Sequence, residues 1–153
     1  MMKRLLGALW RVAPKGLRRW GVRLVEPRFT VTAGAVVTDA EGRVLVLEHR
    51  FRTGSGWGIP GGFLEKGEQP EEALRRELRE EIGLELESAE IAFARTLKKP
   101  RQIEIIFRCK PKGKLGRKNA EIKSAGWFDL ESLPPGLGRE QRRLINRALN
   151  RLE

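Results

Sequence analysis

The sequence has one cysteine, no tyrosine and no long hydrophobic run. Because Cys109 is the sole cysteine among 153 residues, the chain cannot form an internal disulfide. This scarcity fits a reducing compartment, and we expect a cytoplasmic protein. No uncharged stretch approaches the ~20 residues that a membrane-spanning helix needs. The apolar run near the N-terminus ends at Arg11 without a small-residue cleavage site, so no secretory signal peptide is predicted.

Charge is abundant but unevenly distributed. The length of 153 residues indicates a single domain, and 40% hydrophobic with 33% charged residues indicates a soluble, globular one. The net charge is +11, yet basic and acidic residues number 8 and 1 over 1–28, 7 and 13 over 29–94, 10 and 1 over 95–118, and 6 and 5 over 119–153. An acidic centre between basic flanks suits a site that binds a cation and then a polyphosphate. The alternative is that the basic flanks only keep the protein soluble.

Residues 1–27 predict a basic, helical N-terminal extension. Two short helices are expected within 3–25, separated by a Pro- and Gly-bearing break at 13–16. Each helix has an apolar face, formed by Leu5, Leu6, Leu9 and Trp10 in the first and by Leu17, Trp20, Leu24 and Val25 in the second. Such a segment packs on its own domain or on a second subunit, which would make a homodimer. Contact with an anionic membrane surface or with RNA is the alternative.

The remainder, 28–153, alternates between strand and helix patterns. Strands are expected at 29–38, 43–49, 86–97, 102–109 and towards the end of 121–130. The first two are expected to pair as a hairpin through a turn at 39–42. Glycine-bearing loops are expected at 50–58 and 110–118, and a C-terminal helix at 140–152 with Leu144, Ile145, Ala148 and Leu152 facing inward. This order predicts an α/β domain with a mixed sheet between helices.

The stretch from Gly61 to Leu84 organises the chain. It opens on Pro60, Gly61 and Gly62, which predict a turn. Pro70 suits the first turn of a helix over 71–82, and Gly83 is a natural C-terminal stop. Leu74, Leu78 and Ile82 recur at helical spacing and form one apolar stripe.

Three glutamates, Glu77, Glu80 and Glu81, share a neighbouring face of this helix. Like charges at this spacing destabilise a helix unless a cation sits among them. Carboxylate oxygens are the hard ligands that Mg²⁺ or Mn²⁺ prefers. The alternative reading is a solvated, amphipathic surface helix.

The spacing favours the metal-binding reading. Gly62, Glu68 and the run from Arg76 through Glu77, Glu80, Glu81 and Gly83 to Leu84 resemble the Nudix box of the Nudix hydrolases at every defined position. The resemblance implies an α/β/α sandwich over about 28–153. It also implies Mg²⁺- or Mn²⁺-dependent cleavage of a diphosphate linkage in a nucleoside diphosphate derivative.

The resemblance also implies roles for individual residues. Glu77 and Glu81 would be metal ligands, Glu80 a ligand or water contact, and the Gly61 carbonyl a further ligand. Arg76 would orient Glu68, and Gly62, Glu68 and Gly83 would support the motif. The general base would be a box glutamate, such as Glu77 or Glu80, or Glu121 from a later loop. Arg50 and Arg52, in the loop ahead of the box, are candidate substrate-binding residues.

Substrate choice lies outside the box. Pro100 follows Leu84 by sixteen residues, which resembles the ADP-ribose pyrophosphatases of the family, whereas the diadenosine-polyphosphate class tends to carry a tyrosine nearby. This favours ADP-ribose or another nucleotide sugar. The alternatives are a nucleoside triphosphate pyrophosphohydrolase and a non-catalytic module that binds a nucleotide or RNA. The presence of all three glutamates of the helix favours catalysis over binding alone.

Overall fold

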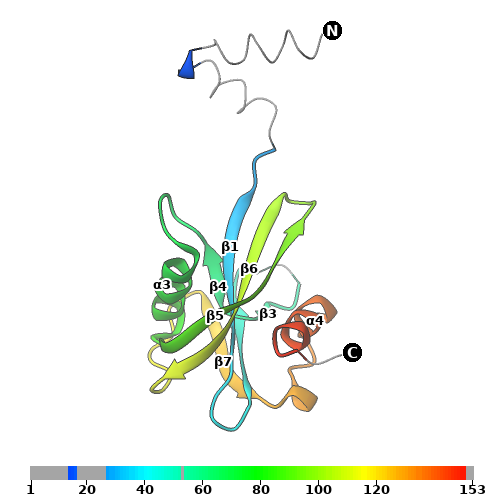
Figure 1. The fold of residues 1–153 in the computed structure, drawn as a ribbon. Helices are drawn as coiled ribbons and strands as arrows, with labels where there is room; N and C mark the ends of the chain where they lie inside the picture. The colour runs from blue at the N-terminus through cyan, green and yellow to red at the C-terminus, as the bar shows by residue number, and fades with distance from the viewer. Residues whose placement is uncertain (1–13, 17–26, 53, 151–153) are drawn as a thin grey trace.

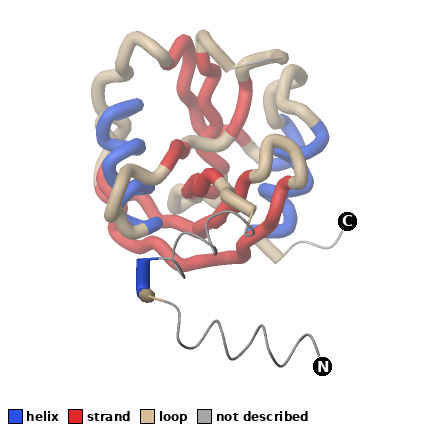
Figure 2. Tube along the Cα trace, turned by 90° about the horizontal axis from the view of Figure 1, so that it is seen from above, coloured by secondary structure: helices blue, strands red, loops and turns tan. Residues whose placement is uncertain are grey.

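The computed structural model describes residues 14–16, 27–52 and 54–150, which form strands layered between helices (Figure 1). The elements are β1 (Thr30–Val37), β2 (Val44–His49), β3 (Trp57–Gly58), β4 (Gly61–Phe63), α3 (Pro70–Ile82), β5 (Glu85–Leu97), β6 (Gln102–Lys112), β7 (Ile122–Phe128), a 3-10 turn (Leu130–Ser132) and α4 (Arg139–Ala148). Helices α3 and α4 lie on opposite sides of the strands (Figures 1 and 2). The predicted α/β/α architecture is confirmed.

Most of the predicted N-terminal extension falls outside the described residues. Its two helices, and its contact with a second subunit, a membrane or RNA, therefore stay predictions. Within the part of the chain that the structure describes, no helix has the length and hydrophobicity required to span a membrane.

The strands form two sheets. The first has the order β4-β1-β6-β5, and the second has the order β3-β2-β7. β1 runs parallel to β6 and antiparallel to β4, which makes the first sheet mixed, as predicted. β5 and β6 form a long antiparallel hairpin. The second sheet is antiparallel throughout.

The predicted hairpin between 29–38 and 43–49 is wrong. The turn forms, because the Asp39 carboxylate accepts hydrogen bonds from the backbone N and from Nε of Arg43, both at 2.8 Å. However, β4 and β6 already occupy the two edges of β1, and an isolated bridge between Thr38 and Val44 is the link to β2. The chain thus crosses from one sheet to the other at this turn.

One hydrophobic core lies on each side of the strands. β2 contributes to both, since Leu45 and Leu47 pack towards α3 while Val44 and Val46 pack towards α4. Four consecutive apolar residues, 44–47, supply both of these faces. The inward positions Leu144, Ile145 and Ala148 of α4 are also confirmed as buried. α4 ends at Ala148, and Leu152 lies outside the described residues.

Helix α3 confirms the prediction over 71–82 and adds Pro70 at its start. Gln69 donates its backbone N–H to the Glu72 carboxylate at 2.8 Å, which satisfies one of the free amides of the first turn. Gly83 ends the helix with φ of 62°, the left-handed conformation that glycine adopts readily. The apolar stripe of Leu74, Leu78 and Ile82 is fully buried. That burial fixes the direction of the glutamate-bearing face.

Further element boundaries differ from the prediction. The expected loop 50–58 ends in the short strand β3, which pairs with β2. Gly61 and Gly62, predicted as part of a turn, form the short strand β4 on the edge of the first sheet. β6 continues to Lys112 instead of ending at 109, because Lys112 pairs with Glu85 at the start of β5. Pro111 is tolerated there because the β1 side of β6 is no longer paired beyond Cys109.

Candidate active site

Two glycines bring strand β4 against the carboxylates of α3. A Cβ at Gly62 would overlap the Glu77 carboxylate, and one at Gly61, where φ is 142°, would overlap the carbonyl oxygen of Ala33. The backbone N–H of Gly61 also lies near the Glu81 carboxylate and favours its charged form. Glycine at both positions is therefore required for this close approach.

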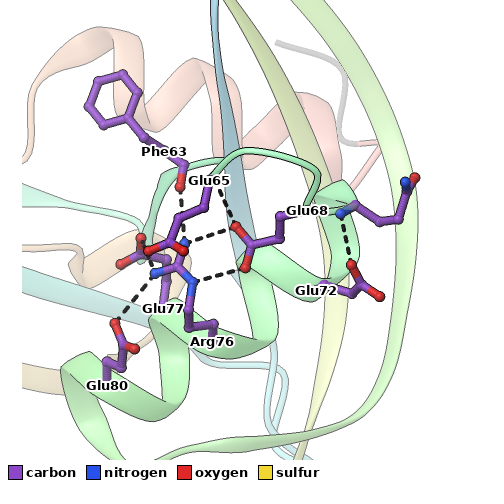
Figure 3. Close-up of polar contacts among 8 residues, drawn as sticks. Phe63, Glu65, Glu68, Glu72, Arg76, Glu77 and Glu80 are labelled. Carbon is purple, nitrogen blue, oxygen red and sulfur yellow. Dashed lines mark hydrogen bonds and ion pairs between the residues drawn. The ribbon is translucent and has the colours of Figure 1, made fainter.

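Arg76 forms hydrogen bonds to several residues between Gly61 and Leu84 (Figure 3). Its guanidinium holds the Glu68 carboxylate through two hydrogen bonds of 2.9 and 3.1 Å. It also donates to Glu77 at 2.9 Å and to the carbonyl oxygen of Phe63 at 3.1 Å. The pairing lowers the pKa of Glu68 and raises that of Arg76. The expected contact between Arg76 and Glu68 is present, and it extends to Glu77 and to β4.

The three glutamates of the helix face are not equivalent. The side chains of Glu77 and Glu81 are 19% and 8% exposed, and both lie against the glycines of β4. The side chain of Glu80 is 59% exposed and touches Arg76 at 3.4 Å. Glu80 therefore lies at the rim of the site. This position suits contact with a water, or with a cation through water, better than direct coordination of a buried cation.

Glu81 is the buried centre of the site. Burial, followed by the charge of Glu77, raises its pKa to about 7, while the Gly61 N–H and the charge of Arg52 oppose the rise. Its Oε2 atom is buried and has no hydrogen-bond partner among the described residues. A buried polar atom without a partner is costly, and a cation beside it would offset that cost.

The carboxylates fit a hard divalent cation. Glu77 lies against Gly62 and Glu81 near the Gly61 backbone, and the two carboxylates are close enough for the charge of Glu77 to raise the pKa of Glu81. Within the described ranges, no three acidic, histidine or cysteine side chains form a complete metal-binding group. Mg²⁺ is commonly held by one or two carboxylates together with waters and substrate phosphates. The donor set fits that mode of binding.

His49, at the end of β2, lies beside Glu81, and the sequence reasoning missed it. Its Nδ1 is 3.5 Å from Oε1 of Glu81, and its Nε2 is buried without a partner among the described residues. Burial and the charge of Arg52 lower the pKa of His49 to about 4, so the imidazole is neutral at pH 7. Its signal in the sequence was slight: it is the sole histidine, directly before a glycine-bearing loop.

The loop that carries Glu121 passes the C-terminal end of α3. Asn119 donates its backbone N–H to the Glu81 carbonyl, and Gly116 donates to the Ile82 carbonyl, both at 2.9 Å. The Glu121 carbonyl accepts from the backbone N–H of Arg50 at 2.8 Å. The charge of Glu121 contributes to the raised pKa of Glu81. The structure thus brings Glu121 close to the box. Close packing between Gly83 and Gly116 keeps this loop against the helix.

Arg52 and Arg50 differ in position. Arg52 lines a cavity of about 200 Å³ that opens beside Gly61, Gly62 and Phe63. Burial lowers the pKa of Arg52, while the charges of Glu81 and Glu104 oppose that change. Arg50 and Arg52 both keep much of their surface exposed, but Arg50 does not line this cavity. Of the two arginines predicted to bind substrate, Arg52 is the one that the structure brings to the site.

The cavity contains polar residues that the sequence analysis did not single out: Thr32, Gln102, Glu104 and Gln141. Gln141, on α4, accepts a hydrogen bond from the backbone N–H of Ile59 at 3.1 Å. Gln102 and Glu104 lie two residues apart in β6, so the sequence places them on one face of a strand. The sequence could not show which elements surround that face, because β1, β4 and α4 are distant from β6 in sequence.

Comparison with known proteins identifies a family that matches most of the chain. Residues 28–148 match the family described as the NUDIX domain. The chain is 33% identical over 102 residues to a MutT-like protein from Streptomyces ambofaciens, covering 67% of this chain and 65% of that protein. It is 31% identical over 110 residues to the NAD-capped RNA hydrolase NudC of Pseudomonas aeruginosa, covering 71% of this chain and 39% of that protein. The chain therefore spans less than two-thirds of the length of these relatives.

A solved structure agrees with this match. The crystal structure of a MutT NUDIX hydrolase from Burkholderia pseudomallei superposes with a TM-score of 0.70 at 25% sequence identity. The alignment covers 79% of this chain and 98% of that one.

Proposed function

The chain belongs to the NUDIX family, and from that premise we propose that it is a metal-dependent hydrolase of a diphosphate linkage in a nucleoside diphosphate derivative. One observation carries the proposal most directly. The buried Glu81 carboxylate has an oxygen without a partner among the described residues, next to a Glu77 carboxylate that is packed on Gly62. An amphipathic surface helix has no need of such an arrangement.

The reaction transfers one phosphoryl group to water. A new P–O bond forms from the water oxygen, and the bond from that phosphorus to the bridging oxygen breaks. The departing phosphate keeps the electron pair, and the water gives a proton to a base. Mg²⁺, when bound, would lower the pKa of the attacking water and neutralise charge on the phosphate oxygens.

The protein positions these partners. Glu77 and Glu81 would hold the cation, with Glu80 at the rim and the Gly61 carbonyl as a further donor. Arg76 keeps Glu77 in place and joins it to Glu68. The base that takes the proton from water has two candidate locations. Glu121 contributes to the electrostatics of Glu81 from a separate loop, and the box glutamates Glu77 and Glu80 are the alternative.

Features outside the box indicate the substrate class. Pro100 favours ADP-ribose or another nucleotide sugar, and its turn leads directly into Gln102 of the cavity. The relative named as an NAD-capped RNA hydrolase supports a dinucleotide-type diphosphate. The relative named MutT-like keeps nucleoside triphosphates as the second candidate. A nucleotide- or RNA-binding module without catalysis is the third.

A substrate panel tests the proposal. Purified protein with Mg²⁺ is incubated with ADP-ribose, NAD and the nucleoside triphosphates, and the products are separated by chromatography. We expect nucleoside monophosphate from the dinucleotide-type substrates. Release of pyrophosphate from triphosphates alone would support the second candidate. Absence of any cleavage, with retained nucleotide binding, would support the binding module.

Location and assembly are part of the same proposal. The single cysteine supports a cytoplasmic protein, and the basic extension supports contact with a second subunit, or else with a membrane or RNA.

A further inference from the structure

The cavity beside β4 combines apolar walls with a polar floor. Its walls include Gly34, Ile59, Phe63, Ile106 and Leu144. Its floor is formed by side chains from two neighbouring strands: Thr32 of β1 and Gln102 and Glu104 of β6. At about 200 Å³ it is smaller than the roughly 300–1,000 Å³ of pockets that enclose a drug-sized ligand. It has room for one part of a substrate.

The floor is held in a fixed arrangement. Gln102 donates from Nε2 to the hydroxyl oxygen of Thr32 at 2.8 Å and to Oε1 of Glu104 at 3.4 Å. The other carboxylate oxygen of Glu104 accepts from Nε of Arg95 at 2.5 Å. The Glu104 side chain is only 19% exposed. A carboxylate fixed in this way presents acceptor positions to the cavity.

We propose that this cavity binds the nucleobase of the substrate, and that Glu104 selects a base that presents an N–H donor, such as an exocyclic amino group. The inference rests on the proposed function and deepens it, because it names the part of the substrate that the cavity takes and the residue that discriminates.

Charge and shape distinguish the base from the other parts of a nucleotide. A phosphate beside Glu104 would lie against a carboxylate that already pairs with Arg95, so it would gain no free cation there. Phosphates fit instead beside Gly61 and Gly62, near Glu77 and Glu81, where a bound cation would offset their charge. A nucleobase is apolar on its two faces and polar along its edge, which matches apolar walls and a polar floor. A ribose carries hydroxyl groups that the apolar walls would leave unpaired.

The selection follows from the cost of an unpaired acceptor. A base with an amino group at this edge gives the Glu104 carboxylate a charge-assisted hydrogen bond. A base without a donor there would leave an acceptor position of the Glu104 carboxylate unfilled, although Arg95 and Gln102 would still donate to this side chain. Sites built to receive a polar group discriminate strongly against analogues that lack it.

Binding is measured by calorimetry in EDTA, where hydrolysis does not contribute. The probes are ADP-ribose and its analogue in which hydrogen replaces the 6-amino group. We expect wild-type protein to bind ADP-ribose at least about tenfold more tightly than the analogue. Glu104→Gln keeps the shape of the side chain and should reduce the preference to about threefold or less. Glu104→Leu, which removes the acceptor, should abolish it, and melting temperatures identify a variant that fails to fold.

Glu140→Gln is the matched control. Glu140 also pairs with Arg95, at 3.3 Å, but it is exposed and does not line the cavity. We expect this variant to keep the wild-type preference. If it loses the preference as Glu104→Gln does, the effect is transmitted through Arg95 and the proposal is overturned.

Two further outcomes would overturn the proposal. One is equal affinity of wild-type protein for the two probes. The other is a Glu104-dependent preference for ADP-ribose over its 2′-deoxy analogue without a preference for the amino group, which would assign Glu104 to the ribose. Because binding is read without turnover, a preference for the amino group in a protein that cleaves no diphosphate would count against the proposed function alone.

Discussion

Arg76 donates a hydrogen bond from Nη2 to the carbonyl oxygen of Phe63 at 3.1 Å. In Figure 3 the Phe63 ring points away from the guanidinium, and Phe63 lines the cavity beside β4. One arginine of α3 thus fixes the strand that lies between the box carboxylates and the cavity. We expect catalysis and substrate binding to depend on the same contact.

Arg76→Lys tests this dependence. A lysine ammonium cannot reproduce the fork that holds Glu68 while also reaching Glu77 and the Phe63 carbonyl. We expect kcat/KM to fall about 10- to 100-fold, because small displacements of positioning groups have effects of this size. Arg79→Lys is the control, since Arg79 pairs on the surface with Glu85. Equal steady-state kinetics for the two variants would contradict the assigned role.

Gly62→Ala tests the close approach of β4 and α3. The added Cβ would overlap the Glu77 carboxylate and push it from its position. We expect activity to fall by about 100-fold or more. Gly138→Ala is the control, because a Cβ at Gly138 meets nothing within 4 Å. Full activity of Gly62→Ala at saturating Mg²⁺ would show that Glu77 does not need this position.

Glu121→Gln separates the two candidate bases. If Glu121 takes the proton from water, kcat should fall about 100-fold or more while the affinity for Mg²⁺ stays unchanged. Calorimetric titration with Mg²⁺ and steady-state kinetics measure the two quantities. Glu87→Gln, at an exposed position on β5, controls for the loss of one charge. A weakened Mg²⁺ affinity would make Glu121 a ligand, and unchanged kinetics would leave the base role to the box glutamates.

Cys109 should be unreactive in the folded protein. Burial raises the pKa of its thiol to about 12, so at pH 8 almost none of it is the nucleophilic thiolate. We expect the reaction with a thiol reagent to be more than about a thousandfold slower in native protein than in denatured protein. Rapid labelling of native protein at pH 8 would mean that β6 opens readily at this position.

The sequence predicted helix α3 well because its signals are local. Pro70 and Gly83 mark the ends, and the buried stripe of Leu74, Leu78 and Ile82 repeats at helical spacing. The carboxylates that share the helix follow from the same spacing. The different burial of these carboxylates does not follow from the spacing, because it depends on where β4 lies against the helix.

The pairing of strands and the cavity could not be predicted in the same way. β1 and β2 looked like hairpin partners because they are adjacent in sequence, yet β1 pairs with β6, more than sixty residues away. His49 meets Glu81, and Gln141 meets Ile59, through contacts that also join separate elements of the chain. Alternation along a strand indicates its faces and says nothing about its neighbours.

The most direct test of metal-dependent hydrolysis is the Mg²⁺-supported activity of Glu81→Gln. The substitution keeps the shape of the side chain and removes the buried negative charge. Because burial raises the pKa of Glu81, its charged form is disfavoured in the fold, and the melting temperature should not fall. Glu85→Gln, on the surface, is the control. We predict a loss of at least about 100-fold in diphosphate hydrolysis; unchanged turnover in Glu81→Gln, or full wild-type activity in excess EDTA, would contradict the account.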